Sequence, residues 1–447
     1  MSKRMTRRRV MSNTARSAGA LTFLWLVPRR VLGANERLNV AGIGVGGKGS
    51  SDIRECGDED VVALCDVDDE RAAKSYSRFP DAKRYKDYRK MFDVEGKRID
   101  AVTVSTPDHT HAHAAILAMS LGKHVHCQKP LTHSVHEARL MRETAARMKV
   151  ATQMGNQGHC HDDWRRLVEL IQADVIGKVR EVYVWTNRPI WPQGMDRPTE
   201  TMPTPVHLDW DLWLGPAPAR PYNQAYAPFR WRGWWDFGTG ALGDMGCHKI
   251  DLAFFALKLD APISVEARSS TVSAETPPKW SIITYTFGSR GDLPPVKLTW
   301  YDGQRKPPAS LVGGRELPAN GSILVGDKDT LFVHETSGPG FFMSGATVED
   351  HAHVPMTLPR MPGSDDRKNI DGNHRREWIA ACKGGPPALS NFDYAGRLTE
   401  AVLLGNVALR AGKRIEWDAT RMKVTNVPEA DRYIRRAYRK GWELAAS

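Results

Sequence analysis

A glycine-rich turn between two apolar runs constrains this chain more than any other feature. Residues 38–43 (LNVAGI) lead directly into residues 44–49 (GVGGKG), a G-x-G-x-x-G turn, and a second apolar run at 61–65 ends in Asp66. In a strand–turn–helix–strand unit, these glycines permit the tight turn, the approach of a pyrophosphate and the packing of the helix on the strand. The acidic residue takes the ribose hydroxyls. The pattern predicts a dinucleotide site that contains Gly44, Gly46, Gly47, Gly49 and Asp66.

The same glycine spacing also occurs earlier, as Gly42, Gly44 and Gly47. We prefer the later register because it leaves a complete strand in front of the turn. Asp66 has no adjacent arginine, and a carboxylate at this position repels the 2′-phosphate of NADP. The sequence therefore favours NAD, with NADP as the alternative.

Residues 35–155 alternate strand and helix patterns. Strands are expected at 100–105, 124–127 and 150–154, and helices at 113–121 and 135–148. Strands separated by helices of this length form parallel sheets. We therefore expect an α/β fold in which residues 35–155 make a Rossmann dinucleotide-binding domain.

The pattern changes beyond residue 155. After a helix at 164–171, apolar and polar residues alternate with period two, which predicts antiparallel strands with one covered face. We expect residues 156–447 to form an α+β domain for substrate binding and oligomerisation, with a large, mainly antiparallel open sheet. Its C-terminal helices, near 373–383 and 394–410, are able to pack back on the Rossmann domain. Residues 303–370 are rich in Gly and Pro and give no clear pattern. The expected strands are 179–185, 263–268, 281–287, 296–300 and a hairpin at 323–333.

The N-terminal residues 1–34 have the pattern of an export leader. They carry eight Lys and Arg and no acid, so most of the formal net charge of +11 lies there and nucleic-acid binding loses its main support. The segment around Arg7 and Arg8 resembles a twin-arginine signal, and the apolar stretch that follows is too short to cross a bilayer. We expect export to the periplasm or beyond by the twin-arginine machinery, without stable membrane insertion; a disordered basic tail is the alternative.

Histidine and cysteine clusters raise the possibility of zinc. Residues 109, 111 and 113 are histidines, and residues 159–161 read His-Cys-His. Histidines two apart in a loop are more often surface residues or partners of the main chain, so we expect no metal. The six cysteines contain no C-x-x-C pair and predict no disulfide framework.

Three side chains suit the oxidation of an alcohol. Asp244 and His248 are four residues apart, so on a helix they share a face, and Asp251 continues it. A histidine positioned by a carboxylate is a suitable base for a hydroxyl proton. Lys129 follows a predicted parallel strand, where ligands of such sheets bind, and a cation there stabilises negative charge on the reacting oxygen. We predict Lys129, His248 and Asp244 as catalytic residues, with Asp244 orienting His248; a surface pair or helix cap is the alternative for Asp244 and His248.

Tryptophans are concentrated just before this helix. Seven of the 14 lie between Trp185 and Trp235. Aromatic faces beside Arg and Asp suit a sugar, whose C–H face stacks while its hydroxyls form hydrogen bonds; the alternative is that they fill a domain interface. The expected substrate contacts are Trp231, Arg232, Trp234, Asp244 and His248.

Three motifs resemble the glucose–fructose oxidoreductase / inositol dehydrogenase (Gfo/Idh/MocA) family over most of residues 38–447. They are the glycine turn, residues 106–111 (TPDHTH) together with 128–130 (QKP), and residues 240–251 (GALGDMGCHKID). The family usually has Glu-Lys-Pro, so Gln128 departs from it. The resemblance implies a two-domain dehydrogenase with its active site in the cleft between the domains, and a homodimer or homotetramer. The further cofactor contacts that it implies are Ser105, Thr106, Pro107, His111, Gln128, Lys129 and Asn156.

The sequence thus predicts an exported NAD(P)-dependent oxidoreductase that acts on a secondary alcohol of a sugar, polyol or glycoside. Because free nicotinamide cofactor is expected to be scarce outside the cytoplasm, we expect tight binding of NAD. Two alternatives remain. One is an NAD-dependent glycoside hydrolase of the same fold, and the other is a catalytically silent sugar-binding protein.

Overall fold

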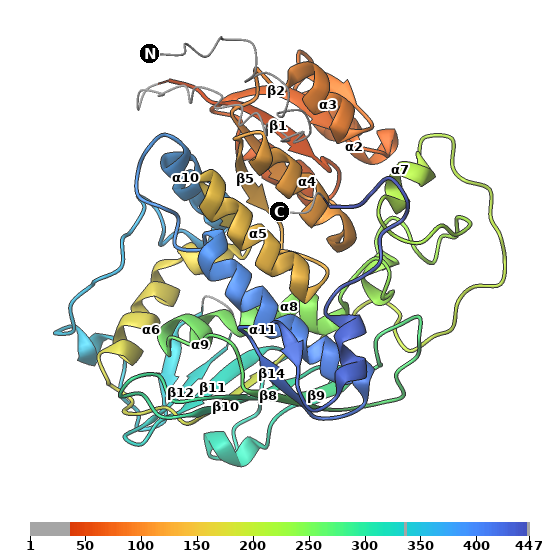
Figure 1. Ribbon diagram of the computed structural model, residues 1–447. Helices are drawn as coiled ribbons and strands as arrows, with labels where there is room; N and C mark the ends of the chain where they lie inside the picture. The colour runs from red at the N-terminus through yellow and green to blue at the C-terminus, as the bar shows by residue number, and fades with distance from the viewer. Residues whose placement is uncertain (1–35, 335–337, 445–447) are drawn as a thin grey trace, which may run out of the picture. The chain divides into compact units, whose positions relative to one another are not determined.

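The computed structural model describes residues 36–334 and 338–444, so the predicted leader lies outside the described residues. The first sheet is parallel, with the strand order β3-β2-β1-β4-β5-β6 (Figure 1). This is the strand order of the Rossmann fold, and the predicted class of the first domain is confirmed. The strands are β1 (Asn39–Ile43), β2 (Asp60–Cys65), β3 (Lys83–Tyr85), β4 (Ala101–Val104), β5 (His124–Cys127) and β6 (Thr152–Met154).

Five helices connect these strands. One of them, α4, begins at Asp108 and not near residue 113, where the sequence placed its start. Nearly all of α4 is buried, so it has no polar face and its first turn shows no amphipathic period. The helices are α1 (Lys48–Arg54), α2 (Asp69–Arg78), α3 (Tyr88–Glu95), α4 (Asp108–Ser120) and α5 (Val135–Met148).

The second sheet has nine strands in the order β13-β12-β11-β7-β10-β9-β8-β14-β15. Among the described strands of this sheet, only β7 and β10 pair in parallel, which confirms a mainly antiparallel sheet. The strands are β7 (Glu181–Trp185), β8 (Ser264–Ser269), β9 (Ser281–Phe287), β10 (Val296–Tyr301), β11 (Gly321–Val325), β12 (Thr330–Val333), β13 (Gly340–Phe342), β14 (Ile415–Asp418) and β15 (Lys423–Val424).

Helices cover one face of the second sheet, with α6, α8, α9 and α11 above it in Figure 1. The long helix α11 also lies beside α5 of the first domain, where Arg139 Nε donates to Glu400 Oε2 at 3.0 Å (Figure 1). The C-terminal helices therefore join the two domains through a shared apolar core. The helices are α6 (Asp162–Gln172), α7 (Trp210–Leu214), α8 (Gly240–Lys249), α9 (Asp251–Ala256), α10 (Ile370–Cys382) and α11 (Phe392–Ala411).

Short 3-10 turns complete the described chain. Residues 303–370, which are rich in Gly and Pro, supply β11 and β12, the hairpin that the sequence predicted, and β13, which it did not predict. The turn η3 of this region brings Val312 against the other face of the sheet, where it packs with Trp185 and Phe332. The turns are η1 (Gln157–Cys160), η2 (Arg230–Gly233), η3 (Ala309–Val312), η4 (Glu349–His351), η5 (Arg367–Asn369) and η6 (Pro428–Tyr433).

The segment after η6 returns to the first domain, where it runs as the dark blue coil past α7 in Figure 1. Arg436 Nη2 donates to the carbonyl of His109 at 2.8 Å, and Arg439 Nε donates to the carbonyl of Gly215 at 2.9 Å. His113 Nε2 lies 2.8 Å from the carbonyl of Trp442. Through these hydrogen bonds, the C-terminal segment connects helix α4 to the loop that follows α7.

All six cysteines are buried free thiols, as the absence of a disulfide framework predicts. In the described part of the chain, none of the helices combines the length and the apolar character that crossing a membrane requires.

Candidate active site

A cavity of about 560 Å³ lies at the carboxyl ends of β1, β2, β4 and β5. Its opposite wall comes from η2 and α8 of the second domain. The volume is that of an ordinary small-molecule site. The predicted residues on its wall are Gly44, Gly46, Gly47, Asp66, Ser105, Thr106, Pro107, His111, Gln128, Lys129, Trp231, Arg232 and His248.

The glycine turn has the geometry of a phosphate cradle. Gly44 has a φ of +74°, which favours glycine, and a Cβ on Gly46 would lie 2.9 Å from the Arg71 side chain. A Cβ on Gly49 would lie 1.8 Å from the carbonyl oxygen of Gly44. Gly49 therefore does not line the cavity but lets α1 pack against the turn. No side chain caps the start of α1, and the N–H groups of Gly49 and Ser50 donate to the carbonyls of Gly46 and Gly47 at 3.0 and 3.2 Å.

Asp66 fixes the turn as well as facing the cavity. Its Oδ2 accepts hydrogen bonds from the N–H groups of Val45 and Gly46 at 2.8 and 2.9 Å. Burial raises the pKa of Asp66, while these main-chain donors pull it down. The N–H of Gly46 is thus already engaged by Asp66, and room for a pyrophosphate comes from the missing side chain. The residues present fit a dinucleotide.

An arginine is closer to this site than the sequence suggested. Arg71 lies five positions after Asp66, and its guanidinium is 2.8 Å from where a Cβ of Gly47 would stand. Its side chain lines the cavity beside Asp66. Arg71 is therefore a cation that is able to pair with the 2′-phosphate of NADP, while Asp66 favours the 2′-hydroxyl of NAD.

His111 connects the two turns that form the floor of the cavity. Its ring nitrogens lie 2.8 Å from the carbonyl of Thr106 and 2.9 Å from the carbonyl of Pro130. Burial lowers the pKa of His111, so its ring is neutral at neutral pH. The histidine thereby holds the turn after β4 against the turn that carries Lys129.

A buried carboxylate that the sequence analysis missed explains the unusual Gln128. Asp52 on α1 is 2% exposed, and its Oδ2 accepts from Gln128 Nε2 at 2.9 Å and from Ser105 Oγ at 2.7 Å. Its other oxygen, Oδ1, lies 3.2 Å from Nη2 of Arg375 on α10. A glutamate at position 128 would face Asp52 with a second negative charge. The signal for Asp52 was an acid on the face of α1 that turns toward the sheet.

We predict that Gln128→Glu weakens dinucleotide binding and lowers the melting temperature. Two carboxylates would share one buried position, and burial of an unpaired charge costs several kcal/mol. Calorimetric titration with NAD and thermal unfolding measure both effects. The double variant Asp52→Asn/Gln128→Glu removes the repulsion and should recover much of the loss; failure to recover would contradict this account.

Lys129 is held by Asp244. Its ammonium donates to Asp244 Oδ1 at 2.9 Å and to the Asp244 carbonyl at 2.8 Å, and Arg232 Nε lies 3.3 Å from the same Oδ1. Against the effect of burial, the charges of Lys129 and Arg232 lower the pKa of Asp244 to about 2. No hydrogen bond joins Asp244 to His248 among the described residues. The prediction that Asp244 orients His248 is therefore wrong: both lie on α8, but the carboxylate turns to the two cations.

His248 enters the cavity as a neutral imidazole. Burial and the positive charge of Lys129 lower its pKa well below the usual value, and Asp244 only partly opposes them. A neutral ring is able to accept a proton at neutral pH. Lys129 and His248, from different domains, both line the cavity.

The aromatic residues divide into two groups. Trp231 lines the cavity with the Arg232 guanidinium 4.2 Å from its ring centre, and Phe229 and Trp213 line it as well. Trp234 does not reach the cavity: it is fully buried, and its Nε1 donates to the carbonyl of Ala225 at 2.7 Å. It therefore belongs to an apolar cluster with Tyr226 and Phe237 and is not part of the cavity wall, where the sequence analysis had placed it.

Three other residues that the sequence singled out also lie off the cavity wall. Asp244 does not line the cavity, although it bonds to Lys129, which does. Asn156 is buried and accepts a hydrogen bond from Ser390 Oγ, while its amide nitrogen has no partner among the described residues. Asp251 does not continue the face of Asp244, because α8 ends at Lys249 and Asp251 begins α9. The Asp251 carboxylate instead lies 2.9 Å from His159 Nδ1. Within residues 36–334 and 338–444, no three His, Cys, Asp or Glu side chains gather as a metal site would require.

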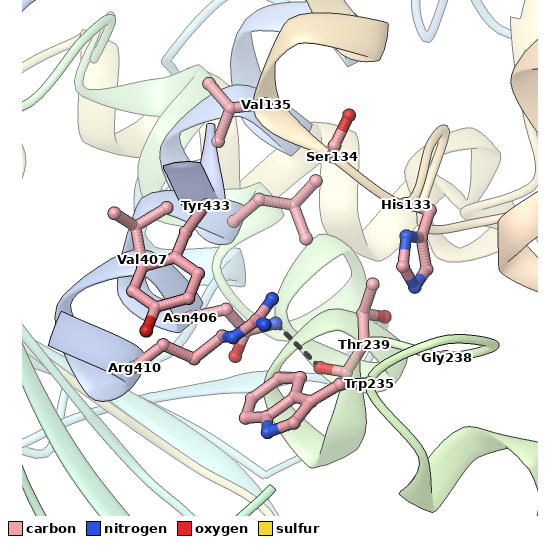
Figure 2. Close-up of a pocket in the computed structure, with 11 residues that line it drawn as sticks. His133, Ser134, Val135, Trp235, Gly238, Thr239, Asn406, Val407, Arg410 and Tyr433 are labelled. Atoms are coloured by element: carbon pink, nitrogen blue, oxygen red, sulfur yellow. Dashed lines mark hydrogen bonds between the residues drawn. The ribbon is translucent and has the colours of Figure 1, made fainter. Parts of the chain in front are cut away.

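A second, small cavity of about 30 Å³ lies behind this site (Figure 2). Arg410 extends between the rings of Trp235 and Tyr433, with its guanidinium 4.2 Å from the Tyr433 ring centre. Thr239 forms part of the wall, and its carbonyl accepts from Asn406 Nδ2 at 2.8 Å (Figure 2). A cavity of this size has room for about one or two water molecules.

Family models give the class of protein. The Rossmann strand order, the glycine turn and the model "Oxidoreductase family, NAD-binding Rossmann fold", which matches residues 38–156, define an NAD-binding oxidoreductase. A second model, "Oxidoreductase family, C-terminal alpha/beta domain", matches residues 174–293. Together the two models cover more than half of the sequence, and the chain belongs to the Gfo/Idh/MocA family.

Curated relatives are dehydrogenases of sugars and polyols. D-glucoside 3-dehydrogenase of Escherichia coli K12 is 25% identical over 371 residues, which are 80% of this chain and 90% of the relative. Myo-inositol 2-dehydrogenase of Thermotoga maritima is 26% identical over 157 residues, 35% of this chain and 46% of the relative. With several of its curated relatives, the chain thus shares less than half of the relative's length.

Solved structures share the fold. The WlbA dehydrogenase from Bordetella pertussis in complex with NADH and UDP-GlcNAcA superposes with a TM-score of 0.61 at 16% identity, over 86% of this chain and 99% of that one. The aldose-aldose oxidoreductase from Caulobacter crescentus complexed with glycerol gives 0.55 at 16% identity, over 85% and 100%. At these identities the likeness establishes the two-domain architecture.

Proposed function

We propose that this protein is an NAD-dependent dehydrogenase that oxidises a secondary alcohol of a sugar, polyol or glycoside. The observation that carries the proposal is that Lys129, which Asp244 holds, lines the same cavity as the neutral ring of His248. Trp231, Phe229 and Trp213 give the cavity aromatic faces that suit the C–H face of a sugar. The names of the relatives, D-glucoside 3-dehydrogenase and myo-inositol 2-dehydrogenase, support the same substrate class.

The side chains divide the chemistry between them. Asp244 holds Lys129 in place, so that the ammonium donates a hydrogen bond to the reacting oxygen and stabilises its developing negative charge. His248 accepts the hydroxyl proton, since its low pKa leaves the ring unprotonated. Asp66 and the glycine turn would hold the dinucleotide. When bound, NAD supplies the acceptor for the hydride that leaves the same carbon.

Single-turnover reduction of bound NAD by a panel of sugars, polyols and glycosides tests the proposal. In His248→Ala, turnover should fall by about 10²–10⁴ while NAD stays bound, because a general base is lost. The exposed His353, replaced by alanine, is the matched control. Wild-type turnover in His248→Ala would exclude His248 as the base, and an unreactive wild-type protein would contradict the dehydrogenase assignment.

The cofactor is proposed to be held tightly and recycled by a second substrate. Mass spectrometry of the small molecules released from the purified protein should then detect NAD at close to one molecule per chain. The same assay, combined with measurement of released aglycone, separates a dehydrogenase from an NAD-dependent glycoside hydrolase. A sugar-binding protein without activity would give neither reduction of NAD nor aglycone.

Export by the twin-arginine machinery is proposed from the leader sequence alone, with Arg7 and Arg8 as the residues that are read. Changing both to lysine keeps the charge, so the double variant should leave precursor in the cytoplasm only if the arginines themselves are recognised. Fractionation and immunoblotting give the distribution. The matched control is Arg29→Lys/Arg30→Lys, and normal export of Arg7→Lys/Arg8→Lys would refute the assignment.

A further inference from the structure

A second carboxylate, Asp108, faces the cavity beside the Lys129–Asp244 pair. It is the first residue of α4, it is 4% exposed, and it lines the cavity. Its Oδ2 accepts a hydrogen bond from Thr239 Oγ1 at 2.7 Å. Thr239 occupies the N-cap position of α8 without capping that helix through its side chain, because its hydroxyl is donated to Asp108 instead. The bond therefore links the first turn of α4 to the start of the helix that carries Asp244 and His248.

The two carboxylates of the site differ in how firmly they hold their charge. Lys129 and Arg232 act on both, but Asp244 contacts them directly, whereas Asp108 accepts only from the Thr239 hydroxyl. Burial raises the pKa of Asp108 to about 7, and the negative charge of Asp244 adds to this rise. Asp244 therefore stays ionised, while Asp108 exchanges a proton near neutral pH. When the environments of two titratable groups push their pKa values apart in this way, the two groups serve different roles.

His248 is unable to keep the proton that it accepts. Oxidation of an alcohol breaks the C–H and O–H bonds, and it releases a hydride from carbon and a proton from oxygen. His248 takes the proton first, but its lowered pKa returns the ring to the neutral form at neutral pH. A second group on the cavity wall has to hold the proton while substrate and dinucleotide fill the front of the cleft. Asp108 lines the cavity and has a raised pKa, whereas the pKa of Asp244 is lowered and the carboxylate of Asp66 is engaged by the N–H groups of the glycine turn.

We propose that Asp108 is the proton-holding residue of the site, which binds a proton when the nicotinamide ring loses its positive charge and releases it when that charge returns. The inference rests on the proposed function. A nicotinamide ring bound in the cavity that Asp108 lines would carry a positive charge only when oxidised. Loss of that charge would make the Asp108 carboxylate more basic and able to take up the proton that His248 releases. By reciprocity, an ionised Asp108 favours oxidised NAD and a protonated Asp108 favours NADH.

Other charged and titratable groups surround Asp108. Lys129, Arg232 and Asp244 are the charged groups that act on it. Burial raises the pKa of the thiols of Cys127 and Cys247, so both stay neutral. His109 and His111 on the same helix have lowered pKa values, again because they are buried. A pH effect that Asp108→Asn abolishes is therefore assigned to Asp108.

Through Thr239, Asp108 is able to exchange its proton with the small cavity and not with the large one. Asp108 lines the large cavity, and Thr239 lines the small one (Figure 2). A protonated Asp108 donates to Thr239 Oγ1, whose own hydrogen then turns toward water in the small cavity. Arg410 and Tyr433 form walls of both the small cavity and an outer groove. The proton thus has a route that a filled cleft does not block.

The affinities of the full-length protein for NAD and NADH, measured by calorimetric titration from pH 6 to pH 8, test this proposal without turnover. The NADH preference should fall as pH rises, by a factor on the order of ten over this range, because an ionised Asp108 attracts the oxidised ring. Asp108→Asn keeps an acceptor for Thr239 and should make the ratio of the two affinities independent of pH. Thr239→Val removes a hydrogen bond that lowers the pKa of Asp108, so the midpoint should move to higher pH.

Infrared difference spectra give an independent readout. Reduction of bound NAD should produce a carboxylic acid C=O band in the wild type and not in Asp108→Asn. The exposed Asp81, changed to asparagine, is the matched control and should behave as the wild type. Tight NAD binding with a pH-independent ratio, or the same pH dependence in Asp108→Asn, would overturn this inference alone. If the wild type bound neither NAD nor NADH, the proposed function would fail and this inference with it.

Discussion

Replacing Lys129 with methionine is expected to lower kcat/KM for the alcohol by about 10²–10⁴, at least as much as His248→Ala. The variant removes the hydrogen bond to the reacting oxygen and leaves Asp244 with Arg232 as its remaining cation. Because Lys129 also lowers the pKa of His248, its loss should raise that pKa and narrow the pH range in which the ring is neutral. Steady-state rates from pH 5 to pH 9 measure both effects.

The matched control is Lys97→Met, an exposed lysine of the same domain, which should leave kcat/KM unchanged. Lys129 and His248 act on the same hydroxyl group, so the double variant should lose far less than the product of the two single losses. Independent, multiplicative losses would show that the two residues do not serve one step. Retention of NAD by Lys129→Met, checked by calorimetry, separates a chemical defect from loss of the fold.

Replacing Gly49 with alanine is expected to weaken NAD binding by about 10- to 100-fold, the equivalent of overpacking a tight site by one methyl group. The new Cβ would lie 1.8 Å from the carbonyl oxygen of Gly44, and a main-chain oxygen is unable to move aside as a flexible side chain would. Helix α1 would have to shift, and with it Asp52, the buried partner of Gln128. Titration with NAD and thermal unfolding give the two readouts.

Gly288→Ala provides the control for this substitution, because a Cβ there has its nearest neighbour at 3.8 Å. That variant should bind NAD as the wild type does and unfold at a similar temperature. Equal NAD affinity in Gly49→Ala and the wild type would mean that the glycine register 44–46–49 is not the one that forms the site.

Local sequence patterns predicted much of this fold, because they are set by short-range chemistry. The glycine turn followed by Asp66 marks a Rossmann unit, and period-two alternation marks strands such as β9, whose residues alternate between buried and half-buried. The helical spacing of Asp244 and His248 was also correct, since both lie on α8. The shared helix did not determine the partners of Asp244 and His248, however. The carboxylate of Asp244 bonds to Lys129 and Arg232, which come from other parts of the chain.

The remaining features depend on contacts between distant residues. Asp52 meets Arg375 of α10, and Asp108 meets Thr239 across 131 positions, so neither pairing leaves a local signal. The position of Trp234 was missed for the same reason: composition shows an aromatic cluster but not which rings face the cavity. The early start of α4 was missed because a helix buried on all sides has no periodic pattern.

Because the C-terminal segment packs on α4, these contacts form only after the end of the chain has been synthesised. His113 and Trp442, whose hydrogen bond helps to fasten that segment, are 329 positions apart, and Asp52 likewise waits for Arg375 of α10. A nascent chain on the ribosome therefore displays residues 1–34, the predicted leader, long before its nucleotide domain acquires these partners. Completion of the cleft follows translation and does not accompany it, so the N-terminal half on its own lacks contacts that the finished cleft requires.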